Sequence, residues 1–305
     1  MSRTKNADRS LLANKTYPFH GWLGLLLVAV FWYLNWSLPG LRTHWGFFPL
    51  WLGYCLAVDG LVLYRTGTSL LTRSWRKYFG LFLISAPAWW LFEAFNLRTQ
   101  NWSYLGAEQF STLQYAFWTT LSFTTVMPAV MGSAELAGSL WLFHPQIMSA
   151  TPHASRGLVI YPGRFTTLAF FIAGFLMLAL LLIWPRLFFP FIWLSVYFII
   201  EPVNVWLGNR SLADATKAGD WWPVIALWLG VLMTAFFWEM WNYFSFPKWT
   251  YHVAWGDWLR LFEMPLLGYG GYLPFALELY ALYHLVVGWL GDKKPDYIRL
   301  PSAPS

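Results

Sequence analysis

The chain has 305 residues, of which 58% are hydrophobic and only 11% are charged. Because ordinary soluble domains carry about a quarter charged residues, this composition excludes a soluble globular protein and indicates a membrane protein. The formal net charge of +6 does not indicate a nucleic-acid partner, since the basic residues lie in loops between apolar segments. The single cysteine, Cys55, excludes an intrachain disulfide and is interpreted as core filler.

Apolar segments long enough to cross a membrane, which takes about twenty residues, recur along the chain. We expect spans at 20–38, 46–64, 78–96, 112–142, 164–184, 187–207, 221–244 and 262–290. The first is too long for a signal peptide and no cleavage site follows it, so we expect it to be retained. The fourth and eighth are long enough to tilt, kink or break. The expected fold class is an all-α polytopic membrane protein of about eight helices.

The basic residues alternate between sides of the membrane. By the positive-inside rule, both termini are expected in the cytoplasm, and the membrane is expected to be a bacterial inner membrane. The expected organisation is a cytoplasmic basic tail (1–19), a first four-helix repeat (20–143), a cytoplasmic linker (144–163), a second four-helix repeat (164–291) and a cytoplasmic tail (292–305).

An internal duplication organises the sequence. The segment WWLFEAFNLRTQNWSY, Trp89–Tyr104, returns as FFWEMWNYFSFPKWTY, Phe236–Tyr251. The matched pairs are Glu93 with Glu239, Asn96 with Asn242, Trp102 with Trp249, Tyr104 with Tyr251 and, further away, Asp59 with Glu201. Four spans followed by four spans keep one orientation, so this is a parallel repeat whose halves are expected to meet around a shared site.

The duplicated carboxylates have two interpretations. Glu93 and Asn96 are three residues apart and project from one helix face, as do Glu239 and Asn242. An ionisable group in a span is costly and is by default a functional-site hypothesis. The alternative is hydrogen bonding that stabilises the interface between the repeats. For the other matched pair, Asp59 and Glu201, we favour structural ion pairs over a proton or cation site; the expected partners are Arg65 and Arg210.

The eighth span contains three glycines, at 268, 270 and 271, and Pro274. These residues predict a broken helix with a binding site between its halves, and the alternative is close helix packing at the glycines. Glu278 lies near the expected midplane and is a candidate general acid, with Glu135 as its counterpart in the first half. Tyr280 and His284 are candidate ligand contacts on the same span.

The six histidines form no metal-ligand cluster, and the chain has no Walker loop or Asp-rich diphosphate motif, so neither a metal nor a dedicated cofactor is expected. Aromatic residues make up 21% of the chain, more than interfacial belts require. They indicate a cavity for a flat or long apolar molecule such as a polyisoprenoid, quinone or pigment. Their ring faces stabilise a carbocation by about 0.5–2 kcal/mol per contact. The alternative for any single ring is contact with lipid.

Each half thus has a helix with a glutamate followed by asparagine, a W-x-Y loop, and a helix with proline followed by glutamate. This pattern resembles the small lycopene cyclase domains of carotenoid biosynthesis, which also come as two homologous membrane units. The matching residues are Glu93 with Trp102 and Tyr104, Glu239 with Trp249 and Tyr251, and Pro274 with Glu278. The resemblance implies cyclisation started by a carboxyl that protonates a polyene. The P-x-E-[ED] signature of that family is absent here.

Three functions are compatible with these patterns. The first is an enzyme acting on an isoprenoid or other apolar lipid by general-acid chemistry, with Glu278, Glu239 and Glu93 as candidate catalytic residues. The second is a non-catalytic subunit of a membrane complex that binds pigment, quinone or lipid, and the third is a small-solute or proton-coupled transporter. The expected partners are membrane lipids and other integral subunits. The candidate ligand-binding residues are Asn96, Asn242, Trp102, Trp249, Tyr104, Tyr251, Tyr280 and His284.

Overall fold

The computed structural model describes residues 16–140 and 157–302. Most of the predicted basic tail and of the predicted linker lie outside the described residues. The first half contains α2 (Phe19–Ser37), α3 (Thr43–Thr66), α4 (Leu70–Arg73), α5 (Trp75–Thr99), β1 (Trp102–Leu105), α6 (Thr112–Phe123) and α7 (Val126–Gly138). The second half contains α9 (Arg164–Ile183), α10 (Pro185–Phe188), α11 (Ile192–Leu207), α12 (Ala213–Thr216), α13 (Trp222–Tyr243), β2 (Lys248–Tyr251), β3 (Arg260–Leu261), β4 (Met264–Pro265) and α14 (Tyr269–Trp289).

The prediction of a helical membrane protein is confirmed. Within the described residues, six helical segments are long and apolar enough to cross a membrane: α2, α3, α5, α9, α10 continued by α11, and α13. The outermost helices also expose large apolar side chains, with Phe19 of α2 81% exposed and Phe165 of α9 88% exposed. Soluble proteins rarely present such extended apolar faces to water, so these faces are suited to lipid.

The fourth predicted span is broken, between α6 and α7. The hydroxyl group of Ser85, on α5, bridges the break: it donates to the carbonyl oxygen of Phe123 at 2.5 Å and accepts from the backbone N–H of Met127 at 2.9 Å. Backbone groups that lose their helical partner inside a membrane need such a substitute. A side chain from a neighbouring helix therefore makes this break tolerable.

The eighth predicted span differs from expectation. Residues 260–268 form the β3–β4 hairpin and a 3₁₀ turn, and α14 then continues from Tyr269 to Trp289 through Pro274. The prediction of two half-helices separated at the glycines is wrong, because Gly270 and Gly271 lie in the first turn of a continuous helix. Proline at 274 removes only the hydrogen bond to the carbonyl group of Gly270, at the start of the helix, where the loss is small.

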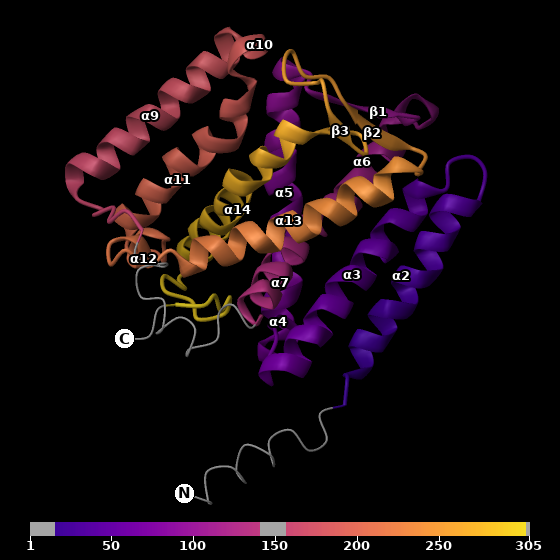
Figure 1. Cartoon of the computed structure of the whole chain (residues 1–305), viewed down its shortest axis with the longest axis horizontal. Coiled ribbons are helices and arrows are strands. Elements are labelled where there is room, and N and C mark those ends of the chain that lie inside the picture. The colour runs from indigo at the N-terminus through magenta and orange to yellow at the C-terminus, as the bar shows by residue number, and fades with distance from the viewer. Residues whose placement is uncertain (1–15, 141–156, 303–305) are drawn as a thin grey trace, which may run out of the picture.

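The helices form three groups (Figure 1). The α2–α3 pair lies on one side, the α9–α11 pair on the other, and α5, α7, α13 and α14 lie between them. Glycines bring backbones into contact at the main crossings: a Cβ atom on Gly24 would lie 2.6 Å from the oxygen of Gly53, and one on Gly230 would lie 2.5 Å from the Cα atom of Ala134. Small residues of this kind let membrane helices associate by van der Waals packing.

Two ends of the molecule are distinguishable. The strands β1 and β2 and the helix α10 lie at one end, which we call the ribbon end. The short helices α4 and α12 and the segment after α14 lie at the opposite end, which we call the tail end (Figure 1).

Asp59 and Glu201 hold the short tail-end helices. Asp59 accepts from the Ser69 hydroxyl at 2.7 Å and the Leu71 N–H at 2.9 Å, and Glu201 accepts from the Ala213 N–H at 3.0 Å. The predicted pairing of these carboxylates with Arg65 and Arg210 is wrong. The free N–H groups at the start of a helix need acceptors, and the two carboxylates supply them.

Candidate functional site

The two W-x-Y segments pair with each other. Strands β1 and β2 are antiparallel, with Trp102 opposite Tyr251 and Tyr104 opposite Trp249. Each tryptophan of one copy therefore faces the tyrosine of the other copy. The segments lie about 150 residues apart in the sequence and join the two halves at the ribbon end (Figure 1).

The two asparagines fasten this ribbon to the helices. Asn96 donates to the carbonyl oxygen of Trp102 at 2.8 Å, and its side-chain oxygen accepts from the N–H groups of Asn101 at 2.9 Å and Trp102 at 3.3 Å. Asn242 does the same for Trp249, donating to its carbonyl oxygen at 2.8 Å and accepting from its N–H at 2.9 Å. An amide side chain offers both a donor and an acceptor, so it replaces a neighbouring strand for these backbone groups.

Glu93 holds aromatic side chains of the first half. Its Oε1 atom accepts from the indole N–H groups of Trp89 and Trp102, both at 3.0 Å, and from the hydroxyl group of Tyr104 at 2.5 Å. Burial and the adjacent Glu93 carboxylate raise the pKa of Tyr104 well above its ordinary value. The phenol therefore stays protonated and keeps donating.

Glu239 has the equivalent role in the second half. Its Oε1 atom accepts from the hydroxyl groups of Tyr251 at 2.7 Å and Tyr272 at 2.6 Å. Burial and Glu239 likewise raise the pKa of Tyr251. Both carboxylates therefore have a structural role, which is to hold aromatic side chains in place. A catalytic role for either one is a hypothesis.

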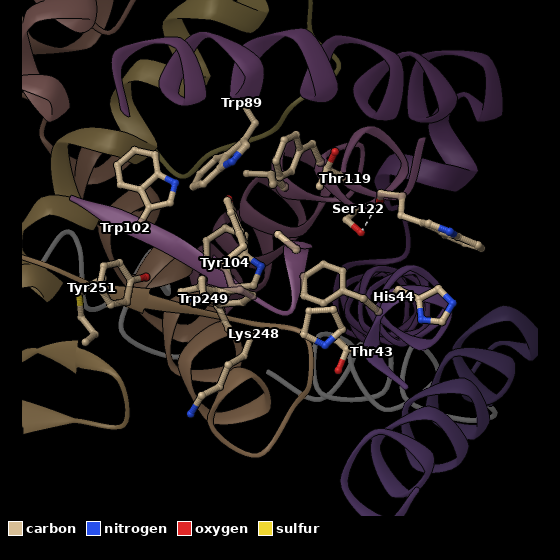
Figure 2. A pocket seen from close by; sticks show the side chains of 18 of the residues that line it. Thr43, His44, Trp89, Trp102, Tyr104, Thr119, Ser122, Lys248, Trp249 and Tyr251 are labelled. Carbon is tan, nitrogen blue, oxygen red and sulfur yellow. Dashed lines mark hydrogen bonds between the residues drawn. The ribbon is translucent and has the colours of Figure 1, made fainter. Parts of the chain in front are cut away.

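An aromatic cavity of about 170 Å³ lies between the halves at the ribbon end, beside these anchors (Figure 2). Its walls are mainly aromatic and come from both halves: Phe47, Trp89, Trp102, Tyr104, Phe110, Tyr115, Trp118 and Phe123 from the first, and Trp193, Trp238, Trp249, Tyr251 and Tyr272 from the second. The predicted ligand-binding residues Trp102, Tyr104, Trp249 and Tyr251 all line it.

The expectation that carboxylates and amides line this cavity is wrong. Glu93, Asn96, Glu239 and Asn242 stand behind the wall and orient the rings that form it. Oε1 of each glutamate and the amide groups of both asparagines are occupied by indole, phenol and backbone partners, so the aromatic faces are left toward the cavity. The duplicated motif shapes the site without entering it.

The few polar residues in the wall are largely engaged elsewhere. Thr119 and Ser122 donate to the carbonyl groups of Tyr115 and Trp118 in their own helix, at 2.6 and 2.8 Å. Lys248 is paired with Glu263. An apolar engineered cavity of about 150 Å³ stays dry and binds benzene. A cavity of this size and lining therefore fits one ring, or a short stretch of a longer apolar chain.

Glu278 lies apart from the cavity, as do Tyr280 and His284. The Glu278 side chain is fully buried and faces the backbone of α11 at Val196 and Tyr197. The predicted site thus separates into an aromatic cavity at the ribbon end and a buried carboxyl deeper in α14. Its counterpart Glu135 is bound to Arg73 and to the backbone N–H of Arg299, at 2.7 Å for the latter.

Several lining residues are not among those predicted from the sequence. Trp193 belongs to a segment, Phe188–Trp193, that repeats Phe47–Trp51, so the duplication held a signal for Trp193 and Phe47. The lining residues of α6, such as Trp118, have no match in the other half, so the duplication could not indicate them.

Among the described residues, no group of three or more histidine, cysteine or acidic side chains is placed to hold a metal ion. Comparisons of the chain with protein-family models, with characterised proteins and with solved structures found no match.

Proposed function

We propose that this protein binds a long or flat apolar molecule, of the isoprenoid, quinone or pigment class, in the aromatic cavity between its halves. The observation that carries the proposal is the wall itself, which consists of aromatic rings from both halves, held by hydrogen bonds to Glu93 and Glu239. Such pockets, mostly apolar and formed in advance, are typical of small-molecule sites.

We also infer that the halves form a four-plus-four parallel repeat with its tail end in the cytoplasm. The reciprocal pairing of Trp102 with Tyr251 and of Tyr104 with Trp249 supports a local two-fold relation. The basic residues near α4 and after α14 support the orientation.

An enzymatic form of this proposal has one supporting observation. Tyr104 and Tyr251 line the cavity, and each donates to a glutamate behind it, the half-buried Glu93 and the buried Glu239. The chemistry implied by the resemblance to lycopene cyclase domains uses a carboxyl as the acid, so this form requires Glu93 or Glu239 to be protonated and to pass its proton into the cavity by way of the tyrosine in front of it. Binding is the simpler proposal, because Oε1 of each carboxylate already accepts from at least two donors.

The test is to extract the full chain gently from native membranes into lipid nanodiscs, and to record its absorbance spectrum and the mass spectrum of its organic extract. We expect an apolar molecule near one per chain, enriched over the surrounding lipid. If the extract contains bulk membrane lipids in their bulk proportions, the binding proposal is wrong. A Tyr104→Phe, Tyr251→Phe chain that retains the same molecule unaltered argues for binding, while one that accumulates a linear precursor argues for the enzymatic form.

A further inference from the structure

A second set of buried polar side chains runs between α11 and α14 toward the tail end. We call it the α11–α14 seam; its members are Glu278, Glu201, Asn204, Asn209 and His284. Asn204 donates to the carbonyl oxygen of Ala281 at 2.9 Å, and Asn209 donates to the side-chain oxygen of Asn204 at 3.0 Å. The seam lies outside the aromatic cavity.

Three titratable side chains of the seam have polar atoms without a hydrogen-bond partner in the described part of the chain. They are both carboxyl oxygens of Glu278, Oε2 of Glu201 and Nε2 of His284. Their side chains are 0%, 5% and 1% exposed, respectively, so bulk water does not reach them directly. An ionised carboxylate in such surroundings is strongly disfavoured, and a neutral carboxylic acid at Glu278 is not.

The corresponding region of the first half is built differently. Glu135 holds the same place in α7 as Glu278 holds in α14, the tenth residue of the helix, yet it is paired with Arg73. The hydroxyl groups of Tyr54 and Ser133, between α3 and α7, bond each other at 2.8 Å. The unpaired carboxyl group of Glu278 therefore has no counterpart at Glu135.

The unpartnered nitrogen of His284, Nε2, is the ring atom that can accept a proton. Its Nδ1 atom lies 2.8 Å from the carbonyl oxygen of Tyr280, and a carbonyl oxygen only accepts, so Nδ1 carries the hydrogen. In the neutral ring Nε2 then has a free lone pair. The ring is flanked by Tyr280 and Tyr283, at centroid distances of 4.1 and 5.0 Å.

The seam reaches the charged tail end. The charged groups that act on His284 are Arg210, Asp292 and Lys294, and those that act on Glu201 are Asp214 and Lys294. Glu278 faces the backbone of α11 and no charged side chain among the described residues. His284 follows Glu278 by six residues, or about 9 Å along the helix.

We propose that Glu278 is a proton-binding site, which exchanges its proton with solution at the tail end through His284 and Glu201. In the outward step the Glu278 carboxylic acid loses a proton and Nε2 of His284 finally gains it, which gives a carboxylate and an imidazolium. The separation of about 9 Å along the helix is too long for one direct transfer, so the proton crosses it in more than one hop along the seam. The imidazolium then releases the proton toward Glu201 and the tail-end solution, and uptake is the reverse. No oxidant or other reactant takes part.

Infrared spectroscopy of the full chain in nanodiscs tests the site. The C=O stretching band of a protonated carboxylic acid in apolar surroundings should be present in the wild type, lost in Glu278→Gln and retained in the matched control Glu135→Gln. The same band in both variants would overturn the proposal. Should Glu278→Gln fail to fold, a hydrophobic carbodiimide, which attacks protonated carboxyls, serves as the probe on the wild type. Mass spectrometry should then find the adduct on Glu278, and an unlabelled Glu278 would count against the site.

Isotope exchange tests the path. After transfer to D₂O, the band should shift as Glu278 takes up deuterium, and His284→Phe should slow this shift at least about tenfold, because its ring cannot relay a proton. Tyr283→Phe, a neighbouring change that leaves the imidazole in place, should exchange at the wild-type rate. Equal rates in His284→Phe and wild type would refute the path while leaving the site intact. These results do not depend on whether the aromatic cavity binds a ligand.

Discussion

The segment that follows the W-x-Y strand takes different forms in the two halves. In the first half it forms α6, and in the second half it forms the β3–β4 hairpin. Five residues of α6, Tyr115, Trp118, Thr119, Ser122 and Phe123, line the cavity, whereas the strands of the hairpin contribute Met264. The anchors of the ribbon are duplicated but the cavity wall is not. Duplicated anchors therefore support an asymmetric cavity wall, and the asymmetry arises where the two sequences diverge.

The crossings of the central helices differ as well. Gly230 of α13 lies nine residues before Glu239 and meets the backbone of α7, while the residue nine before Glu93 is Ile84. At this matched position, the second half has the glycine that so close a helix crossing needs, and the first half has a bulky isoleucine.

The largest effect is expected at that close crossing. A Cβ atom on Gly230 would lie 2.5 Å from the Cα atom of Ala134 and 2.7 Å from the carbonyl carbon of Ser133, and backbone atoms cannot move aside as side chains do. Gly230→Leu should destabilise the fold by more than about 3 kcal/mol, the upper part of the range for overpacking. The measurement is the yield of monodisperse protein and its thermal midpoint. Gly80→Leu is the matched control, because a Cβ atom there meets nothing within 4 Å; equal losses in both would contradict the account.

Loss of an asparagine anchor should come next. Asn242→Ala leaves the N–H and C=O groups of Trp249 without their partner in a buried place, which should cost about 2–3 kcal/mol. Asn96→Ala should cost less, because Asn96 is only half-buried and solvent replaces part of the loss. Denaturant unfolding followed by tryptophan fluorescence measures both. A larger cost for Asn96→Ala would show that the two anchors are not related as described.

Single tyrosine changes should have smaller effects. Tyr104→Phe removes one of three donors to Glu93, so about 1 kcal/mol is expected. Tyr251→Phe leaves Glu239 with Tyr272 as donor, and combining it with Tyr272→Phe should cost more than the sum of the single changes. A double-mutant cycle in unfolding measurements checks this, and simple additivity would argue against a shared carboxylate.

The smallest effect concerns the hairpin that replaces α6. The Arg260 guanidinium, bonded to Asp257 at 2.6 and 2.7 Å, holds the pKa of that carboxyl below its ordinary value. Because the folded pKa is lower than the unfolded one, the pair contributes stability above the unfolded pKa and loses it as the pH falls through the folded pKa. Asp257→Asn should lower the thermal midpoint slightly at neutral pH and leave it unchanged in acid. A difference that persists in acid would mean that the charge of Asp257 is not its cause.

The long helices could be predicted because each is one apolar run long enough to cross a membrane, as in α2, α9 and α13. The breaks in the fourth and eighth predicted spans could not be predicted, because they depend on contacts with other helices. Nothing in the sequence places the Ser85 hydroxyl beside both Phe123 and Met127. The β3–β4 hairpin at 260–265 was likewise missed, because the apolar run of α14 follows it after only three residues and the two were read as one span.

The candidate site shows a similar division. The duplication predicted that Glu93, Glu239 and the W-x-Y rings lie together, and they do. It could not predict that the carboxylates turn toward the rings rather than the cavity, since this depends on which donors surround each side chain. Glu278 belonged to the same predicted site by composition, but its position along α14 places it in a separate seam.

The most direct test of the central claim is to fill the cavity from its asymmetric wall. In Thr119→Phe, a ring projects into a space of about 170 Å³ from α6, whereas Thr112→Phe adds the same ring at an exposed position of the same helix, outside the cavity. The amount of apolar molecule that co-purifies per chain in nanodiscs should fall at least about tenfold in Thr119→Phe, which corresponds to 1.4 kcal/mol. It should stay unchanged in Thr112→Phe. Equal amounts in wild type and both variants would contradict the account, because the molecule would then be bound elsewhere.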